Sequence, residues 1–166
     1  MLKYLALAFV VSGIVGCDGV SKHVAKETLA GMPPQSYFFD TVRLGYAENP
    51  GSFLSLGEGL PQSVRFALFT VGVGFLLVFL TVYAFRNRKS VAKLFGIAIF
   101  VAGGASNWVD RLPDGRVVDF LNVGVGPLRT GVFNVADMAI MVAVAILILS
   151  EYFEVRKQRR GQRRAA

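Results

Sequence analysis

Cysteine, histidine and charge are all scarce in this chain of 166 residues. A single cysteine excludes a disulfide framework, and a single histidine argues against a metal site built from several Cys and His ligands. We therefore expect no metal site of this kind, and we predict no cofactor. Only 17% of the residues are charged, against roughly a quarter in an average soluble domain. Since 54% are hydrophobic, the composition is typical of a membrane protein.

Two motifs of soluble enzymes are also missing. The glycines at 57, 59, 103 and 104 do not form a phosphate-binding loop followed by Lys and Ser or Thr. Serine-based hydrolysis needs a base near the serine. His23 is single and has no evident partner, so we expect it on the surface. Neither nucleotide chemistry nor a serine hydrolase is indicated.

The positive charge lies next to apolar runs. The net charge is +7, and of the 18 Lys and Arg residues six lie in residues 156–164 and four in residues 86–93. A basic chain can bind nucleic acid, but these positions are typical of charges that orient a membrane protein. We therefore expect no nucleic-acid partner. The loop 86–89 and the C-terminal tail are placed in the cytoplasm, where the tail is expected to attract anionic membrane lipid.

Four apolar segments are predicted to cross the membrane, namely residues 2–17, 66–85, 94–109 and 132–153. The second has no charged residue and about the 20 residues that a spanning helix needs. The third is rich in Gly, Ala and Ser, which let helices approach closely in lipid. Four spans place both termini in the cytoplasm. No internal repeat divides the chain, so we expect one integral membrane domain over residues 1–166.

The two longer connections, residues 18–63 and 110–131, then lie outside. Strand-like stretches occupy residues 37–46 and 116–125, and Gly and Pro punctuate both connections. We therefore predict a mainly α membrane protein, with four transmembrane helices and a small β-sheet on the outer face.

Residues 14–17, Ile-Val-Gly-Cys, offer a competing interpretation of the first segment. They look like the site at which lipoproteins are lipidated and cut, after a Lys and an apolar stretch typical of a signal peptide. A lipoprotein normally ends in a soluble domain, however, and here three further spans follow. We expect Cys17 to be a small buried residue at the end of a helix, neither lipidated nor cleaved.

Polar residues from distant parts of the chain fall at the predicted outer ends of the spans. Ionisable groups at membrane depth cost several kcal/mol unless they lie near the interface or are paired, so each needs a reason. Their convergence at one depth predicts a single polar site. Its candidate members are Asp18, Lys22, Asn49, Asn107, Asp110, Arg111, Asp119, Asn134 and Asp137.

Two pairs in this set have helical spacing. Asp18 and Lys22 are four residues apart, so they share a helix face and are expected to form an ion pair that anchors the first span. Asn107 and Arg111 have the same spacing, and two roles stay open for them. In the first role, their donors and acceptor form hydrogen bonds with an extended peptide backbone. In the second, they form hydrogen bonds that lock the end of the helix to a loop. Asp110 is expected to orient its neighbours.

Asp119 and Asp137 are each a lone carboxylate among apolar residues. Brought together, they would share one proton, because the proximity of two like charges raises one pKa strongly. One would then act as base and the other as acid, as hydrolysis of a peptide bond by activated water requires. The alternative is two separate Asp residues, each buried or paired.

Four stretches resemble lipoprotein signal peptidase, the signal peptidase II family. The third and fourth stretches together are highly specific, and the order and spacing agree over nearly the whole chain. Gly19 and Ser106 depart from the family's usual Gln and Gly, which affects the packing of the third span. The stretches are DGVSK at 18–22, NPGSF at 49–53, the block from Gly103 through NWVDR at 107–111 to VVDF at 117–120, and FNVAD at 133–137.

The resemblance implies an aspartic endopeptidase of the bacterial inner membrane, with a periplasmic sheet, an active site near the periplasmic face and no metal. It implies Asp119 and Asp137 as the catalytic pair. Substrate-binding roles would fall to Asn49, Asn107, Arg111 and Asn134. The substrate would be a diacylglyceryl-modified prolipoprotein cut just before its lipidated cysteine, and globomycin-type inhibitors would bind. A non-catalytic four-span subunit or chaperone is the alternative.

Overall fold

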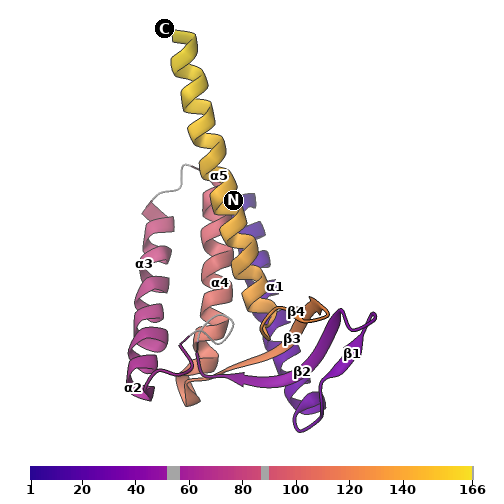
Figure 1. The fold of residues 1–166 in the computed structure, drawn as a ribbon. Coiled ribbons are helices and arrows are strands. Elements are labelled where there is room, and N and C mark those ends of the chain that lie inside the picture. Colours follow the sequence, from indigo (N-terminus) through magenta and orange to yellow (C-terminus); the bar gives the residue numbers. More distant parts are fainter. Residues whose placement is uncertain (52–56, 87–89, 166) are drawn as a thin grey trace.

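The computed structural model describes residues 1–51, 57–86 and 90–165, so Ser52, Phe53 and residues 87–89 of the predicted basic loop lie outside the described residues. Long helices form a bundle with a small sheet at one end (Figure 1). The fold class predicted above is confirmed. The elements are α1 (Leu2–Leu29), β1 (Gln35–Tyr37), β2 (Val42–Asn49), α2 (Gln62–Arg65), the π-helix η2 (Phe66–Gly72), α3 (Val73–Arg86), α4 (Val91–Asp114), β3 (Val117–Val125), β4 (Leu128–Arg129) and α5 (Val135–Ala165).

Within the described residues, four helical segments are long and apolar enough to cross a membrane. All four end beyond the predicted spans, because hydropathy ends where polar residues begin, whereas helical hydrogen bonding continues through them. The fourth begins at Val135 and not at residue 132 as predicted. The 28 residues of α1 measure about 42 Å, against about 30 Å for the hydrocarbon core of a bilayer. The second span is continuous from α2 through η2 into α3.

Cys17 does not have the buried position at a helix end that was predicted for it. The residue lies in the middle of α1 and is exposed. The buried face of α1 is formed by Asp18, Lys22 and Ala25, at helical spacing. Position 17 is turned about 100° from position 18, which directs it away from the neighbouring helices.

Helix α4 is the centre of the bundle and packs against α1, α3 and α5. Its small residues make this possible. A Cβ atom on Gly103 would lie 2.6 Å from the backbone oxygen of Ala136, and one on Gly104 would lie 2.7 Å from the side chain of Leu77. On the α3 side, Trp108 donates from Nε1 to the carbonyl oxygen of Thr70 at 2.7 Å. The predicted close approach at the third span is therefore present on two faces of α4.

The sheet is antiparallel in the order β1-β2-β3-β4. The predicted strand over 37–46 is divided, because β1 ends at Tyr37 and β2 begins at Val42. The stretch 116–125 corresponds to β3. Pairing sets Ala47 of β2 opposite Asp119 of β3, and a bridge between Leu121 and Phe133 ties the chain before α5 to the sheet. The sheet therefore carries β3 to the ends of α4 and α5.

Candidate active site

All nine candidate polar residues gather where the sheet meets the second half of α1, the end of α4 and the start of α5. Eight are buried, and Asn134 and Asp18 have no exposed surface. The side chain of Asp110 is the exception at 28% exposed. Residues up to 119 positions apart in the chain thus form one polar cluster in an apolar molecule.

Asp119 is held from both sides by side-chain amides. Asn49 donates from Nδ2 to Oδ2 at 2.9 Å, and Asn134 donates from Nδ2 to Oδ1 at 2.7 Å. The β2–β3 pairing places Asn49 near Asp119. The pKa of Asp119 is raised to about 6, chiefly by burial and also by the nearby carboxylate of Asp137, although the hydrogen bonds from Asn49 and Asn134 lower it.

Asp137 lies in the first turn of α5 and forms a reciprocal cap with Asn134. The backbone N–H of Asp137 donates to Oδ1 of Asn134 at 2.9 Å, and the backbone N–H of Asn134 donates to Oδ2 of Asp137 at 3.2 Å. This is a capping box, which satisfies two donors at a helix start. The other oxygen of Asp137, Oδ1, accepts from Nδ2 of Asn107 at 2.9 Å.

Asn134 joins the two carboxylates. Its Nδ2 donates to Asp119, and its Oδ1 and backbone N–H contact Asp137. The same Nδ2 donates to Oδ1 of Asn107 at 3.0 Å. Both aspartates therefore belong to one hydrogen-bonded network, which the sequence alone could not establish.

Lys22 is the cation of this network. Its Nζ lies 2.7 Å from Oδ2 of Asp18 and 2.8 Å from Oδ2 of Asp110, and it donates to Oδ1 of Asn107 at 2.7 Å. The predicted ion pair of Asp18 and Lys22 is present. Asp110, predicted to orient its neighbours, contributes the second carboxylate.

Asp18 has two further contacts that sequence analysis missed. Its Oδ1 accepts from the backbone N–H of Ala136 at 2.8 Å, and its Oδ2 accepts from the hydroxyl of Ser106 at 2.6 Å. Asp18 thus connects α1 to the start of α5 and to α4. The sequence analysis treated Ser106 only as a small residue that lets helices approach. Its position directly before Asn107 could have indicated that its hydroxyl belongs to the polar site.

Arg111 forms the lock that was one of its two predicted roles. Its Nη2 donates to the carbonyl oxygen of Gly51 at 2.6 Å, and its Nη1 donates to that of Asn107 at 3.3 Å. Gly51 in turn donates from its backbone N–H to Oδ1 of Asn49 at 2.9 Å. Within the part of the chain that the structure describes, Nε of Arg111 is buried without a hydrogen-bond partner.

His23 is exposed and belongs to no cluster. Among residues 1–51, 57–86 and 90–165, no group of three or more His, Cys, Asp and Glu side chains is arranged to hold a metal ion. The nine residues of the site supply four carboxylates, three amides, one ammonium and one guanidinium.

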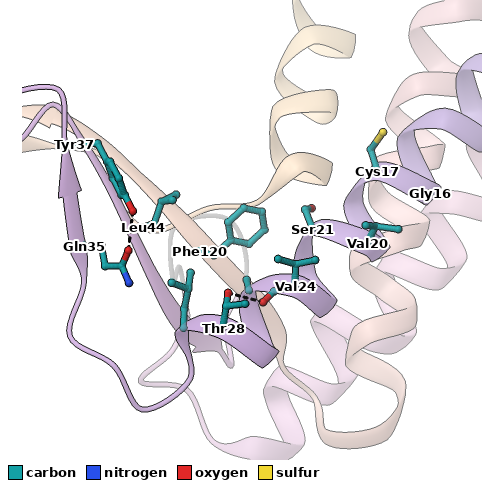
Figure 2. Close-up of a pocket in the computed structure, with 12 residues that line it drawn as sticks. Gly16, Cys17, Val20, Ser21, Val24, Thr28, Gln35, Tyr37, Leu44 and Phe120 are labelled. Carbon is teal, nitrogen blue, oxygen red and sulfur yellow. Dashed lines mark hydrogen bonds between the residues drawn. The ribbon is translucent and has the colours of Figure 1, made fainter.

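An apolar groove of about 700 Å³ lies beside this cluster, between α1 and the sheet. Figure 2 shows Cys17, Val20 and Val24 of α1 on one side and Leu44 and Phe120 on the other. Phe120 directly follows Asp119 in β3, so the groove ends next to the polar cluster.

Sequence comparison places the chain among characterised relatives. A family profile described as Signal peptidase (SPase) II matches residues 7–153. The lipoprotein signal peptidase of Borreliella burgdorferi (strain ZS7) is 30% identical over 162 residues, which cover 93% of this chain and 94% of that protein. The lipoprotein signal peptidase of Enterococcus faecalis (strain ATCC 700802 / V583) is 26% identical over 163 residues, which cover 98% of each.

Two solved structures share the fold, both described as bacterial membrane enzymes studied by the in meso method. The one at 2.3 Å resolution has a TM-score of 0.76 at 21% identity and covers 90% of this chain and 89% of that one. The one at 1.9 Å has a TM-score of 0.73 at 21% identity and covers 87% and 91%. At this identity the similarity concerns the arrangement of helices and sheet.

Proposed function

Because the chain belongs to the signal peptidase II family, and therefore removes signal peptides from prolipoproteins, we propose that Asp119 and Asp137 perform the cleavage. The observation that carries this proposal is the link through Asn134, which contacts both buried carboxylates. Neither carboxylate forms an ion pair with any described residue. The alternative of a non-catalytic four-span subunit is not supported by this family.

Two buried carboxylates without a cationic partner favour a state with one shared proton. In the proposed reaction the ionised carboxylate takes a proton from water, and the resulting hydroxide attacks the scissile carbonyl carbon. The protonated carboxyl donates its proton to the carbonyl oxygen. As the C–N bond breaks, the carboxyl that took the proton from water passes it to the leaving amine, and the other carboxylate takes back the proton of the former carbonyl oxygen, which restores the pair with one shared proton.

The amides around the pair orient its oxygens. Asn49, Asn107 and Asn134 direct N–H groups at Asp119 and Asp137, which leaves the remaining lone pairs to face water and substrate. Arg111 is proposed to contact the substrate backbone through Nε, the donor without a partner among the described residues. Its two other donors keep the guanidinium in place against Gly51 and Asn107.

The substrate is proposed to be a diacylglyceryl-modified prolipoprotein, cut just before its lipidated cysteine. The whole chain would act as one integral domain of the bacterial inner membrane. Both termini would lie in the cytoplasm, as the basic tail indicates, and the polar cluster would lie near the periplasmic face. Globomycin-type inhibitors would occupy the same site, since the resemblance implies them as ligands.

The direct test uses purified protein and a lipidated prolipoprotein in detergent, with cleavage followed on gels. Asn keeps the size of Asp but can neither accept nor deliver the proton. Asp119→Asn and Asp137→Asn are each expected to lower the cleavage rate at least 100-fold, and the double variant should be little worse, because the pair acts as a unit.

The matched control is Asp114→Asn, which makes the same change at an exposed residue at the end of α4. It should cleave at the normal rate. Chelators should have no effect on any variant. Near-normal turnover by either Asp119→Asn or Asp137→Asn, in a folded protein, would show that the two carboxylates do not form the catalytic pair.

A further inference from the structure

Two turns at the free end of the sheet expose large apolar side chains. Phe38 and Phe39, between β1 and β2, are 77% and 107% exposed, and Val125 and Leu128, at the β3–β4 turn, are 74% and 82% exposed. Single exposed apolar residues are ordinary, but contiguous ones mark an interaction surface. We refer to these four residues as the apolar tips.

The Phe-Phe turn adopts an uncommon backbone. Phe38, Phe39 and Asp40 have φ of 51°, 54° and 65°, in the left-handed region that bulky L residues rarely occupy. Three such residues in succession persist only when their surroundings hold them. This conformation directs two aromatic rings outward where an ordinary turn would carry Gly or Asn.

Asp40 is the group that holds the turn. Its carboxylate accepts from Ser36 Oγ at 2.7 Å and from Nε and Nη2 of Arg43 at 2.7 and 2.6 Å. Arg129, at the other turn, donates from Nη1 to the backbone oxygen of Asp40 at 2.6 Å. The two turns are therefore joined into one rigid end, with two guanidinium groups and one carboxylate directly behind the apolar tips.

The free end of the sheet lies at the height at which one membrane-spanning helix, α5, begins. In Figure 1 the turn between β1 and β2 and the strand β4 rise to the level at which α5 begins, whereas the end of α1 lies far below them. The candidate membrane span of α5 starts at Val135. The tips are thus level with the start of the α5 span, whereas α2 and the ends of α1 and α4 extend below them in Figure 1. The apolar groove beside α1 reaches Tyr37, the residue before Phe38.

We propose that the apolar tips insert into the leaflet at the sheet end of the helices, with the bilayer itself as the partner. Phe and Leu side chains bury apolar surface at the boundary of headgroups and acyl chains, and the half-exposed guanidinium group of Arg43 would face lipid phosphates. Insertion holds β3 at a set height. Since β3 carries Asp119 while α5 carries Asp137, lipid contact at the tips maintains the alignment of the two carboxylates.

The single cysteine of the chain makes the test direct. In a Cys17→Ala background, a spin label is placed by Phe39→Cys, by Leu128→Cys or, as control, by Arg116→Cys. Arg116 is exposed just before β3 and pairs with Glu48. The proteins are studied in nanodiscs of phosphatidylethanolamine and phosphatidylglycerol, and label accessibility to oxygen and to a water-soluble nickel chelate is measured.

Labels at 39 and 128 should be accessible to oxygen and protected from nickel, and the label at 116 should show the reverse. Equal nickel accessibility at all three positions would overturn the proposal. Protection of 39 and 128 from both reagents would also overturn it, because that indicates a protein contact. The measurement can be repeated with Asp137→Asn, so its outcome does not depend on catalysis.

A second experiment measures the rate of prolipoprotein cleavage in the same nanodiscs. Phe38→Ser combined with Phe39→Ser should lower kcat/KM about fivefold or more, while Leu at both positions should restore it, because leucine keeps the apolar surface. Met32→Ser, which removes an exposed apolar side chain in the connection after α1, should have no effect. Equal activity of the serine and leucine pairs would contradict an alignment role for the tips.

Discussion

Lys22 donates from Nζ to Oδ1 of Asn107 at 2.7 Å, although the two residues are 85 positions apart. This bond selects one orientation of the Asn107 amide, in which Nδ2 faces Oδ1 of Asp137. The opposite orientation would set the amide oxygen against the carboxylate and the NH₂ group against the ammonium. Lys22 therefore positions the donor that Asp137 uses without contacting Asp137.

Replacement of Lys22 tests this relationship. Lys22→Met leaves Asp18 buried without its cation, which typically destabilises a protein by about 3–5 kcal/mol, and it frees Asn107 to rotate. We expect a lower melting temperature and at least tenfold slower cleavage. Lys26→Met, one turn further along α1 and exposed, is the control and should change neither. Normal turnover by Lys22→Met would mean that Asn107 is oriented by its other partners.

Asn49→Ala should shift the pH dependence of cleavage. Asn49 donates to Asp119 and holds down a pKa that burial has raised to about 6. Without that hydrogen bond the ionised form is less stable, so the pKa of Asp119 rises. The limb of the rate profile set by Asp119 then moves to higher pH, whether Asp119 is the base, which needs pH above its pKa, or the acid, which needs pH below it.

The rate measured from pH 4 to 9 in buffers of constant ionic strength gives the profile. Asn122→Ala is the matched control, because Asn122 lies in β3 but bonds to Thr130 and Arg129 instead of Asp119. Its profile should coincide with that of the unchanged protein. A shift of the Asn49→Ala limb to lower pH would contradict the assigned hydrogen bond.

Gly103→Ala should loosen the contact of α4 with α5. The added Cβ would meet the backbone oxygen of Ala136 at 2.6 Å, and backbone cannot move aside as a flexible side chain does. Overpacking of this kind costs about 1–3 kcal/mol. Because Ala136 lies between Asn134 and Asp137, we expect slower cleavage together with lower thermal stability. Gly19→Ala, where nothing lies within 4 Å, should be neutral.

The orientation in the membrane follows from the basic segments. A reporter fused after Ala166 should be cytoplasmic, and one inserted near Pro33, between α1 and β1, should be periplasmic. Enzymatic reporters active on only one side of the membrane give the answer. The reverse pattern would place the polar cluster on the wrong side for prolipoprotein cleavage.

Cys17 should be neither lipidated nor cleaved, even though residues 14–17 look like a processing site. Cleavage there would remove the first half of α1, including Leu7, which packs against the buried core of Ala84, Leu94 and Ile97. Intact-mass measurement of the purified protein should show the full N-terminal segment. A species that begins at a lipidated Cys17 would contradict this.

Hydropathy and the position of charge were sufficient to predict the four helices and the convergence of the polar residues. Both predictions rest on the high cost of unpaired polar groups in lipid. Backbone groups there must form hydrogen bonds within a helix, and charged side chains must be paired or lie near the interface. Asp119 and Asp137 were identifiable for the same reason, as carboxylates that apolar surroundings do not explain. The helix ends were misplaced because polar residues continue a helix as readily as apolar ones.

Only the tertiary structure decided how the polar groups meet. The contacts of Asp18 with Ser106 and with the backbone of Ala136 depend on how α1 crosses α4 and α5, and no local pattern encodes that crossing. The division of the strand predicted over 37–46 was also visible only in the structure. Two phenylalanines favour a strand by themselves, but at the turn Asp40 is held by Ser36 and Arg43 nearby and by Arg129, 89 residues away. Hydrogen bonds between side chains overrode local strand preference at the turn, and helix crossing decided the contacts of Asp18.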